Sequence, residues 1–363
     1  MKILYIFEKY PGTYQMYIYN LINLLKNKIS LNIMTYSKHK ESDIEILSYG
    51  IKDFFQRLCF YLRISKYKSK DIKYMMKYDI VHLQHSFLFS KVIPLFDFQN
   101  RPKIIITLRG GDTYVKPWVD KRWINFYQVY GTKIDAFITM SQHQKDYLKK
   151  WGIKEEKIFV SPISFNESQC KIPKYPNKNK LKLISAFRLT WEKNIVGVIF
   201  LSLELKKRQI DFVYDVYGDG ADLAKLLFLI DKFQLNNYIF VKGKVENNLL
   251  IDLYSHYDFT VQLSLSESLS MSIIESQSQG TPCVVSNVGG LPEAVIPDES
   301  AIVSDFNNYD FFAQEIIKVY SNESLYFEFS SKGISFVKNQ FSNESECKRL
   351  ISIYNSVLNS NTI

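Results

Sequence analysis

The sequence predicts an α/β protein of two domains, each built on a parallel sheet covered by helices. At 363 residues the chain is longer than a single hydrophobic core usually supports. Apolar runs of strand length alternate with helical patterns in both halves, which is typical of parallel sheets. A polar segment with two prolines, at about residues 166–180, separates the two alternations and has the composition of an interdomain linker.

Composition predicts a cytoplasmic protein. The chain has no run of eighteen apolar residues, so no transmembrane helix is expected. The apolar start at residues 1–7 is too short for a signal peptide and is interpreted as a first buried strand. Four scattered cysteines without metal-ligand spacing fit a reducing compartment.

Charge is distributed unevenly along the chain. Residues 1–180 carry 31 lysines and arginines against 15 acidic residues, a net charge of +16, whereas residues 181–363 carry a net charge of −7. This asymmetry indicates that the first half meets an anionic surface or ligand. Nucleic acid and a phospholipid headgroup layer both fit this charge.

The first half contains five runs that predict strands, at residues 3–7, 31–35, 80–83, 103–108 and 136–140, with helices at 14–28 and 142–150. No G-x-G-x-x-G follows the first strand, which disfavours a dinucleotide-binding enzyme. Residues 51–77 combine one apolar helix face with interleaved lysines and arginines. Such a segment suits either an interfacial helix on anionic lipid or a core-facing helix with a solvated basic face.

Polar residues follow several strands of the first half. Tyr10 comes after the first strand, and His85 comes after the strand at 80–83. The H-x-x-H spacing of His82 and His85 lacks a third ligand and does not predict a metal site. His85 lies further past the strand end and is the better candidate for a ligand-facing residue, with a hydrogen-bonded structural histidine as the alternative.

The second half restarts the alternation with six predicted strands, at residues 182–187, 212–216, 238–241, 259–263, 283–286 and 301–304. Arg188 and Lys193 follow the first of these strands. Lys193 is expected near a helix start, where a cation opposes the helix dipole unless an anion lies between them. Gly218 and Gly243 follow the next two strands and suit either close approach of a nucleotide or tight turns.

The stretch from Ser264 to Glu275 is the most informative in the chain. Serine-rich loop residues precede a short helix that is expected to end near Gly280, with Ser268 or Ser270 as its N-cap. The unpaired amides of a helix N-terminus suit a phosphate oxygen, and carboxylates such as Glu267 and Glu275 accept hydrogen bonds from sugar hydroxyls. An anion site flanked by two carboxylates predicts a nucleotide-sugar site.

These residues resemble the donor site of glycosyltransferase family 4, whose members have the GT-B fold and are retaining enzymes of the kind found in bacterial polysaccharide biosynthesis. Glu267 and Glu275 have seven residues between them, followed by Gln279-Gly280-Thr281-Pro282 and Val288-Gly289-Gly290-Leu291-Pro292-Glu293. The resemblance implies two Rossmann-like domains with parallel sheets facing each other across a cleft. It is strong from about residue 181 to 294.

The resemblance also implies roles for single residues. Arg188, Lys193 and Glu267 would be catalytic, the first two by stabilising the leaving diphosphate and Glu267 by holding sugar hydroxyls. Glu275 would bind the ribose. The remaining donor-binding candidates are Ser268, Leu269, Ser270, Met271, Gly218 and Gly243.

A second motif of the first half matches the family with one difference. Thr107-Leu108-Arg109-Gly110-Gly111-Asp112 resembles the family's Thr-x-His-Gly-x-Asp loop, with Arg109 in the position of a histidine that contacts the donor sugar. Arginine cannot act as a base at neutral pH. His85, Arg109, Asp112 and Tyr10 are therefore expected to contact the acceptor or the sugar, while Asp112 could instead form an ordinary ion pair with Arg109.

The expected domains are an acceptor-binding domain at residues 1–170, a nucleotide-sugar-binding domain at 171–342 and a C-terminal helix at 343–363 that packs back on the first domain. Further helices are expected at 310–320 and 324–338. No Asp-x-Asp triplet occurs, which favours a site without metal. We expect no cofactor, only a UDP-sugar or GDP-sugar as donor substrate.

The predicted function is metal-independent, retaining transfer of a hexose to a polyprenyl-diphosphate-linked saccharide in the synthesis of a capsule, O-antigen or exopolysaccharide. The protein would bind an anionic membrane surface, on the inner face of the cytoplasmic membrane, and no nucleic acid. Two alternatives remain open: a GT-B nucleotide-sugar epimerase, and a non-catalytic protein that binds membranes or polyanions.

Overall fold

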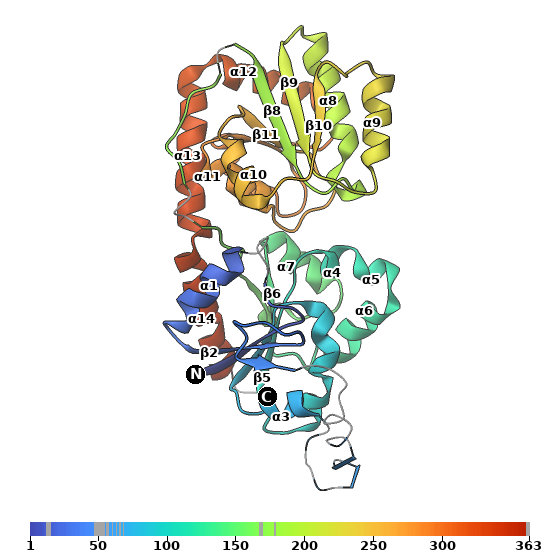
Figure 1. The fold of residues 1–363 in the computed structure, drawn as a ribbon, viewed down its shortest axis with the longest axis vertical. Coiled ribbons are helices and arrows are strands. Elements are labelled where there is room, and N and C mark those ends of the chain that lie inside the picture. The colour runs from blue at the N-terminus through green and yellow to red at the C-terminus, as the bar shows by residue number, and fades with distance from the viewer. Residues whose placement is uncertain are drawn as a thin grey trace. The chain divides into compact units, whose positions relative to one another are not determined.

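The computed structural model describes residues 1–11, 16–46, 55, 58–59, 61–62, 64, 67, 69–166, 170–177 and 179–360. It divides into two compact units (Figure 1). Unit 1 comprises Met1–Pro162 and Glu346–Ile363, and unit 2 comprises Ile163–Ser345. Unit 2 thus begins eight residues before the expected boundary at 171 and ends three residues after the expected boundary at 342. Residues 51–54, 56–57, 60, 63, 65–66 and 68 of the basic segment at 51–77 lie outside the described residues.

Unit 1 is built on a parallel sheet with the strand order β3-β2-β1-β4-β5-β6-β7. Its strands are β1 (Lys2–Phe7), β2 (Ser30–Thr35), β3 (Ile44–Glu45), β4 (Ile80–Leu83), β5 (Lys103–Thr107), β6 (Ala136–Thr139) and β7 (Ile158–Val160). The five strands expected from the sequence are confirmed. The two edge strands, β3 and β7, were not predicted, because they are only two and three residues long, shorter than the apolar runs that mark the buried central strands.

Unit 2 repeats the arrangement with the strand order β10-β9-β8-β11-β12-β13. Its strands are β8 (Leu181–Ala186), β9 (Phe212–Tyr217), β10 (Ile239–Gly243), β11 (Phe259–Gln262), β12 (Cys283–Ser286) and β13 (Ala301–Ser304). All their pairings are parallel. The sequence predicted each of these strands to within one or two residues. Both described sheets confirm the α/β prediction.

In each sheet the strand order reverses once, between β1 and β4 in unit 1 and between β8 and β11 in unit 2. Loops at the carboxyl ends of the strands diverge at such a point, because successive crossovers pass to opposite faces of the sheet. Ligands of open α/β sheets bind there. The loops after β8 and β11 carry Lys193 and Glu267, and the loops after β4 and β5 carry His85 and Arg109.

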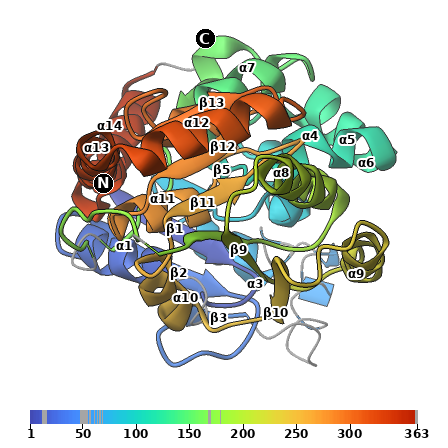
Figure 2. The same cartoon turned by 90° about the horizontal axis from the view of Figure 1, so that it is seen from above.

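Helices cover the faces of both sheets. In unit 1 they are α1 (Met16–Lys26), α3 (Lys70–Met75), α4 (Gly111–Tyr114), α5 (Lys116–Val119), α6 (Lys121–Asn125) and α7 (Gln142–Lys149). In unit 2 they are α8 (Ile195–Lys207), α9 (Leu223–Lys232), α10 (Asn247–Tyr254), α11 (Met271–Ser278), α12 (Tyr309–Ser321) and α13 (Glu323–Phe341). Helix α12 packs on α8, and α11 contacts α10 and α13 (Figure 2).

The last helix, α14 (Asn343–Asn359), belongs to unit 1 from Glu346 onward. Its Tyr354 lies in the core of that unit, with its hydroxyl 2.5 Å from the hydroxyl of Tyr5 and 2.9 Å from Nδ1 of His82. Nε2 of His82 lies 2.7 Å from Oγ1 of Thr107. His82, on β4, is therefore a structural residue that links α14 to β5, while the Tyr5 hydroxyl links α14 to β1. Among the described residues, no helix combines the length and the apolarity that crossing a membrane requires.

Candidate active site

The loops after β8 and β11 of unit 2 are joined by an ion pair between Lys193 and Glu267. The Glu267 carboxylate also accepts a 2.9 Å hydrogen bond from the side-chain amide of Gln262, at the end of β11. Both partners of the ion pair are largely buried, with side chains 13% and 12% exposed. The two sequence candidates therefore lie together, and Gln262 fixes the position of the carboxylate.

Asn194 holds the loop after β8 in place. It adopts a left-handed conformation at the N-cap of α8, with φ of 51°, and its side-chain amide donates a 2.9 Å hydrogen bond to the carbonyl of Leu263. Asparagine tolerates this backbone conformation better than most residues. The bond anchors the residue after Lys193 to the end of β11.

The N-terminus of α11 lies beside this ion pair. Ser270 occupies the N-cap position, as one of the two serines expected there, but its hydroxyl makes no capping bond. It donates instead to Oε1 of Gln262 at 2.6 Å, and the Ser272 hydroxyl donates to the same oxygen at 3.0 Å. No acceptor among the described residues takes the amide hydrogens of Leu269 or Met271. These donors and the helix dipole suit an anion.

Gly289 and Gly290 fix the main chain of Glu267. The amide of Gly290 donates a 2.9 Å hydrogen bond to the Glu267 carbonyl. Gly289 has a φ of 60°, and a Cβ atom at this position would stand 2.0 Å from the same carbonyl oxygen. The Gly-Gly pair of the motif is therefore required by packing against the Glu267 loop.

Glu275 is buried on α11, one turn from the N-terminus of the helix. Its Oε1 accepts a 3.4 Å hydrogen bond from the side-chain amide of Asn247, at the start of α10. Burial raises the pKa of Glu275 to about 7, although the bond from Asn247 opposes that rise. A carboxyl with this pKa is partly ionised at neutral pH. Hydrogen bonds from a polar ligand or from water would favour its ionised form.

Arg188 and Gly218, two further donor candidates, make contacts outside the group formed by Lys193, Glu267 and the N-terminus of α11. The Arg188 side chain is exposed and pairs with Glu192 at 3.3 Å. The amide of Gly218 donates to the Gly243 carbonyl at 2.8 Å. Gly218 has a φ of 136°, and a Cβ there would stand 1.9 Å from the Phe187 carbonyl. The contacts of Gly218 are thus those of a tight turn, the alternative that the sequence left open.

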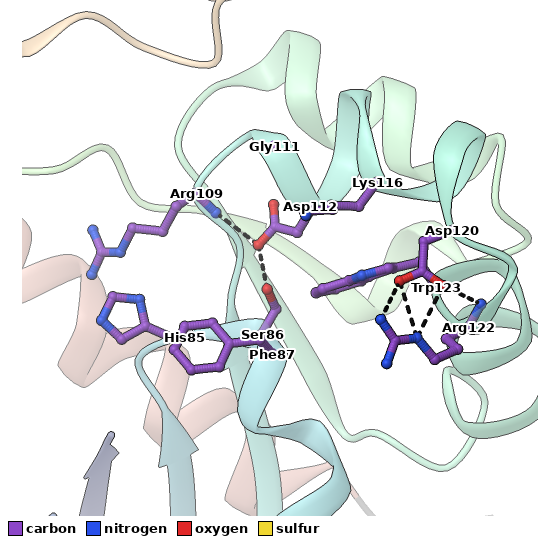
Figure 3. Close-up of a pocket in the computed structure, with 10 residues that line it drawn as sticks. All are labelled: His85, Ser86, Phe87, Arg109, Gly111, Asp112, Lys116, Asp120, Arg122 and Trp123. Atoms are coloured by element: carbon purple, nitrogen blue, oxygen red, sulfur yellow. Dashed lines mark hydrogen bonds and ion pairs between the residues drawn. The ribbon is translucent and has the colours of Figure 1, made fainter. Parts of the chain in front are cut away.

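Unit 1 contains a pocket of about 460 Å³ at the carboxyl ends of β4 and β5. It is lined by His85, Ser86, Phe87, Arg109, Gly111, Asp112, Lys116, Asp120, Arg122 and Trp123. Three of the residues predicted to contact acceptor or sugar therefore share one cavity. In Figure 3 the side chains of His85 and Arg109 lie at one end of it, and Arg122 lies at the other.

Asp112 organises the loop of this pocket. Its carboxylate accepts hydrogen bonds from the Ser86 hydroxyl at 2.5 Å, from the Gly110 amide at 3.0 Å and from the Arg109 amide at 3.2 Å. Burial raises the pKa of Asp112, and these hydrogen bonds oppose the rise. The carboxylate thus binds the main chain of Arg109.

Arg109 changes the chemistry of the neighbouring histidines. Its guanidinium donates to Oε1 of Gln84 at 3.4 Å. Burial and then the charge of Arg109 lower the pKa of His85 to about 4. The same two causes lower the pKa of His82 to about 3. His85 is therefore neutral at physiological pH, when one ring nitrogen can donate a hydrogen bond and the other can accept one.

Tyr10, the remaining candidate, is buried and stacks on His39 at a centroid distance of 4.3 Å. It does not line the pocket. Sequence reasoning missed Gln262, Asn194, Asn247 and Lys116. Only Gln262 carried a signal, because it is a polar residue in the buried apolar run Phe259–Leu263. Among the described residues, no group of three or more His, Cys, Asp or Glu side chains is arranged to hold a metal ion.

Two family models match consecutive parts of the chain. The model described as glycosyl transferases group 1 matches residues 169–336, and the model described as glycosyltransferase family 4 matches residues 15–166. A UDP-N-acetylglucosamine–peptide N-acetylglucosaminyltransferase GtfA subunit of Streptococcus parasanguinis is 28% identical over 169 residues, 45% of this chain and 32% of that protein. The chain thus spans about a third of this relative's length.

Other relatives align over most of their length. An uncharacterised 41.2 kDa protein from the cps region of Klebsiella pneumoniae is 23% identical over 306 residues, which is 79% of this chain and 81% of that protein. A glycosyltransferase structure from Rickettsia africae superposes with a TM-score of 0.75 at 19% identity and covers 99% of each chain. HepE of Anabaena, in complex with UDP and glucose, gives a TM-score of 0.75 at 15% identity and covers 98% of this chain and 100% of that one.

Proposed function

The chain belongs to family 4 of the GT-B glycosyltransferases, and from this premise we propose that it transfers a hexose from a nucleoside diphosphate sugar with retention of anomeric configuration. The observation that carries the proposal is the group formed by Lys193, Glu267 and the N-terminus of α11. It combines a cation and unpaired amides, which can bind a diphosphate, with a carboxylate that can accept hydrogen bonds from sugar hydroxyls.

In the proposed mechanism each of these groups has one task. Lys193 and the amides of Leu269 and Met271 bind the diphosphate and stabilise the charge that grows on it as the glycosidic bond breaks. Arg188, on the same loop as Lys193, adds a second cation. Glu267, released from Lys193 by the incoming phosphate, accepts hydrogen bonds from the sugar hydroxyls.

Glu275 would accept hydrogen bonds from the ribose hydroxyls as a carboxylate. Its buried position behind the N-terminus of α11 supports this role, because a nucleoside attached to a phosphate at the helix end would extend past that helix. No side chain is assigned as a covalent nucleophile. We propose a front-face displacement in which the leaving phosphate takes the proton of the acceptor hydroxyl, so that one glycosidic bond breaks as the other forms.

We further propose a lipid-linked saccharide as the acceptor and the synthesis of a surface polysaccharide as the context. The relative from a cps region supports this context. The neighbour solved with UDP and glucose supports a UDP-sugar over a GDP-sugar. In unit 1 the pocket lined by Phe87, Trp123 and several polar groups has the aromatic and hydrogen-bonding character that suits a sugar ring.

A two-stage experiment tests the proposal. The purified protein is screened against UDP-sugars and GDP-sugars by thermal shift, because a ligand that binds only the native state raises the melting temperature. The donor that stabilises the protein is then incubated with lipid-linked saccharides from bacterial membranes, and the anomeric configuration of the product is read by NMR. Inversion would contradict the mechanism. Release of nucleoside diphosphate without a glycosylated product would favour an epimerase instead.

A further inference from the structure

Unit 1 presents an exposed aromatic and basic surface on α5 and α7, called here the Trp118 face and defined by Trp118, Val119, Lys121, Tyr147 and Lys150. Trp118 and Val119, at the end of α5, are 60% and 73% exposed. Single exposed apolar residues are common on soluble proteins, but adjacent large ones in an ordered cluster mark interaction sites.

The Trp118 face is held in a defined conformation. The indole nitrogen of Trp118 donates a 3.2 Å hydrogen bond to the Tyr147 hydroxyl, and its ring packs edge-on against Trp151 at 5.1 Å. Helix α4 packs against both α5 and α7 and joins the two parts of this face (Figure 1). Because the side chains are already ordered, binding through them costs little conformational entropy.

The lysines of this face are not in ion pairs of the described residues, and one of them lies beside its aromatic rings. Lys121 and Lys150 are exposed, and neither forms an ion pair with a carboxylate of the described residues. The Lys150 ammonium lies 4.9 Å from the ring centre of Trp118 and 5.3 Å from that of Tyr147. In contrast, Arg122 pairs with Asp120 and Lys149 pairs with Asp146. The face therefore combines exposed apolar area with cations that remain available to a partner.

We propose that the Trp118 face binds reversibly to an anionic lipid surface. Tryptophan and tyrosine rings are favoured at the level of lipid headgroups, and lysines beside them attract lipid phosphates. Trp118 and Val119 enter the headgroup layer, while Lys121 and Lys150 face the phosphates. An exposed valine next to the tryptophan favours lipid over nucleic acid, since affinity for nucleic acid comes mainly from phosphate contacts.

This inference rests on the proposed lipid-linked acceptor, because it brings that acceptor to the pocket of unit 1. Three residues that line the pocket flank Trp118 and Val119 in the sequence: Lys116 on α5, Asp120 between α5 and α6, and Arg122 on α6. A saccharide whose lipid stays in the bilayer could enter the pocket without leaving the headgroup layer. The Trp118 face is separate in sequence from the segment at 51–77, for which an interfacial helix was one of two interpretations.

The test measures binding of the full chain to vesicles that contain neither donor nor acceptor. Vesicles of phosphatidylcholine with phosphatidylglycerol are compared with vesicles of phosphatidylcholine alone, by sedimentation at low and at physiological salt. The parent protein should bind the anionic vesicles, and salt should weaken this binding. Trp118→Ser with Val119→Ser, and separately Lys121→Gln with Lys150→Gln, should each weaken it by about tenfold or more.

A matched control separates this face from exposed apolar surface in general. Leu227 and Phe228 on α9 of unit 2 are also adjacent and exposed, at 49% and 63%, and Lys232 lies near the Phe228 ring. Leu227→Ser with Phe228→Ser should leave vesicle binding unchanged. Trp118→Phe keeps the apolar ring, so it should retain binding but lose most of the blue shift that the parent's tryptophan emission shows on anionic vesicles.

Three results would overturn the proposal. The Trp118/Val119 variant could bind anionic vesicles as well as the parent does at low salt, or the Leu227/Phe228 control could lose as much vesicle binding as the Trp118/Val119 variant. The Trp118/Val119 variant could also lose binding to duplex DNA while it keeps binding to vesicles. Transfer to a soluble acceptor should be the same in the parent and in the Trp118/Val119 variant. An inactive parent that still binds vesicles through this face would contradict the proposed function and leave this inference standing.

Discussion

Lys193 and Glu267 form an ion pair across the point where the strand order of unit 2 reverses. Each side chain comes from a different loop, and Asn194 and Gln262 hold the two loops in register. Removing either charge leaves the other largely buried without its partner, which is costly. A phosphate that enters the site can form an ion pair with Lys193 in place of Glu267, which leaves the carboxylate available to other donors. The pair therefore keeps the two loops ordered before the donor binds.

Lys193→Ala should lower the turnover rate about a hundredfold while donor affinity falls much less, because charge on the diphosphate is greater in the transition state than in the bound donor. Steady-state kinetics and a donor titration measure the two effects. Lys232→Ala, which removes an exposed lysine of the same unit, is the control and should change neither. Parent-like turnover in the Lys193 variant would exclude this lysine from the mechanism.

Glu275→Gln should weaken donor binding by about 1–3 kcal/mol, since it replaces charged hydrogen bonds with neutral ones. The pKa of Glu275 in the free protein is about 7, above the ordinary value of a glutamate. If the donor binds the ionised form, affinity should rise with pH through about 7 and binding at lower pH should release a proton. Calorimetry in buffers of different ionisation enthalpy measures that proton.

The contribution of Glu275 to the stability of the free protein should fall as pH rises, whereas donor affinity should rise. A raised carboxyl pKa stabilises the native state at low pH, and this contribution is lost as pH rises from the ordinary glutamate value to about 7. Glu275→Gln should remove that loss. A pH profile of donor affinity that is identical in the parent and in Glu275→Gln would contradict the assignment of Glu275.

Gly289→Ala should displace the Glu267 loop, because the new methyl group would lie 2.0 Å from the Glu267 carbonyl. Donor affinity and turnover should both fall. Gly152→Ala is the matched control: Gly152 also has a positive φ, of 85°, but a Cβ there would meet no atom within 4 Å. Both variants should lose some stability from backbone strain, and only Gly289→Ala should lose activity. Equal activity in the two would show that the collision is relieved without moving Glu267.

Metal independence is a prediction from the absence of an Asp-x-Asp triplet in the sequence. Transfer should continue in excess EDTA at the rate measured in buffer without added metal. Loss of activity that Mn²⁺ or Mg²⁺ restores would show that oxygen ligands of the protein or of the donor assemble a metal site on binding.

The parallel strands were predictable because central strands buried on both faces appear as continuous apolar runs. The edge strand Ile44–Glu45 has no such run and was missed. The site could be predicted only in part. Motif spacing placed Lys193 and Glu267 in one site, but their direct pairing depends on the parallel register of β8 and β11, which no local pattern encodes. Asn247 and Glu275 are separated in sequence and meet only through the packing of α10 on α11.

Asp112, in unit 1, also makes a contact that the local sequence could not predict. Its place in the Thr107–Asp112 loop suggested a role with ligand, or an ion pair with Arg109. Whether a carboxylate faces a ligand or its own loop depends on which donors are near. Here the Ser86 hydroxyl, from the loop after β4, and two amides of its own loop take the oxygens. The Ser86 hydroxyl could not be predicted as a partner of Asp112, because the two residues are far apart in the sequence.

Arg109 provides the last prediction. Its guanidinium is the second cause, after burial, of the lowered pKa of His85. Arg109→Gln should therefore raise that pKa above about 4, while burial keeps it below the ordinary value of about 6.5. A depressed histidine pKa stabilises the native state above 6.5, and this contribution is lost as pH falls toward 4. The variant should therefore lose less stability between these pH values.

NMR titration of the His85 ring resonances measures the shift directly, and thermal melts between pH 4 and 7 measure its effect on stability. Arg122→Gln is the matched control, because Arg122 lines the same pocket but its charge is held by Asp120 and is not among the causes of the His85 shift. An unchanged His85 midpoint in Arg109→Gln would show that burial alone keeps this histidine neutral. In that case the arginine at the family's histidine position would act on the substrate alone and not through His85.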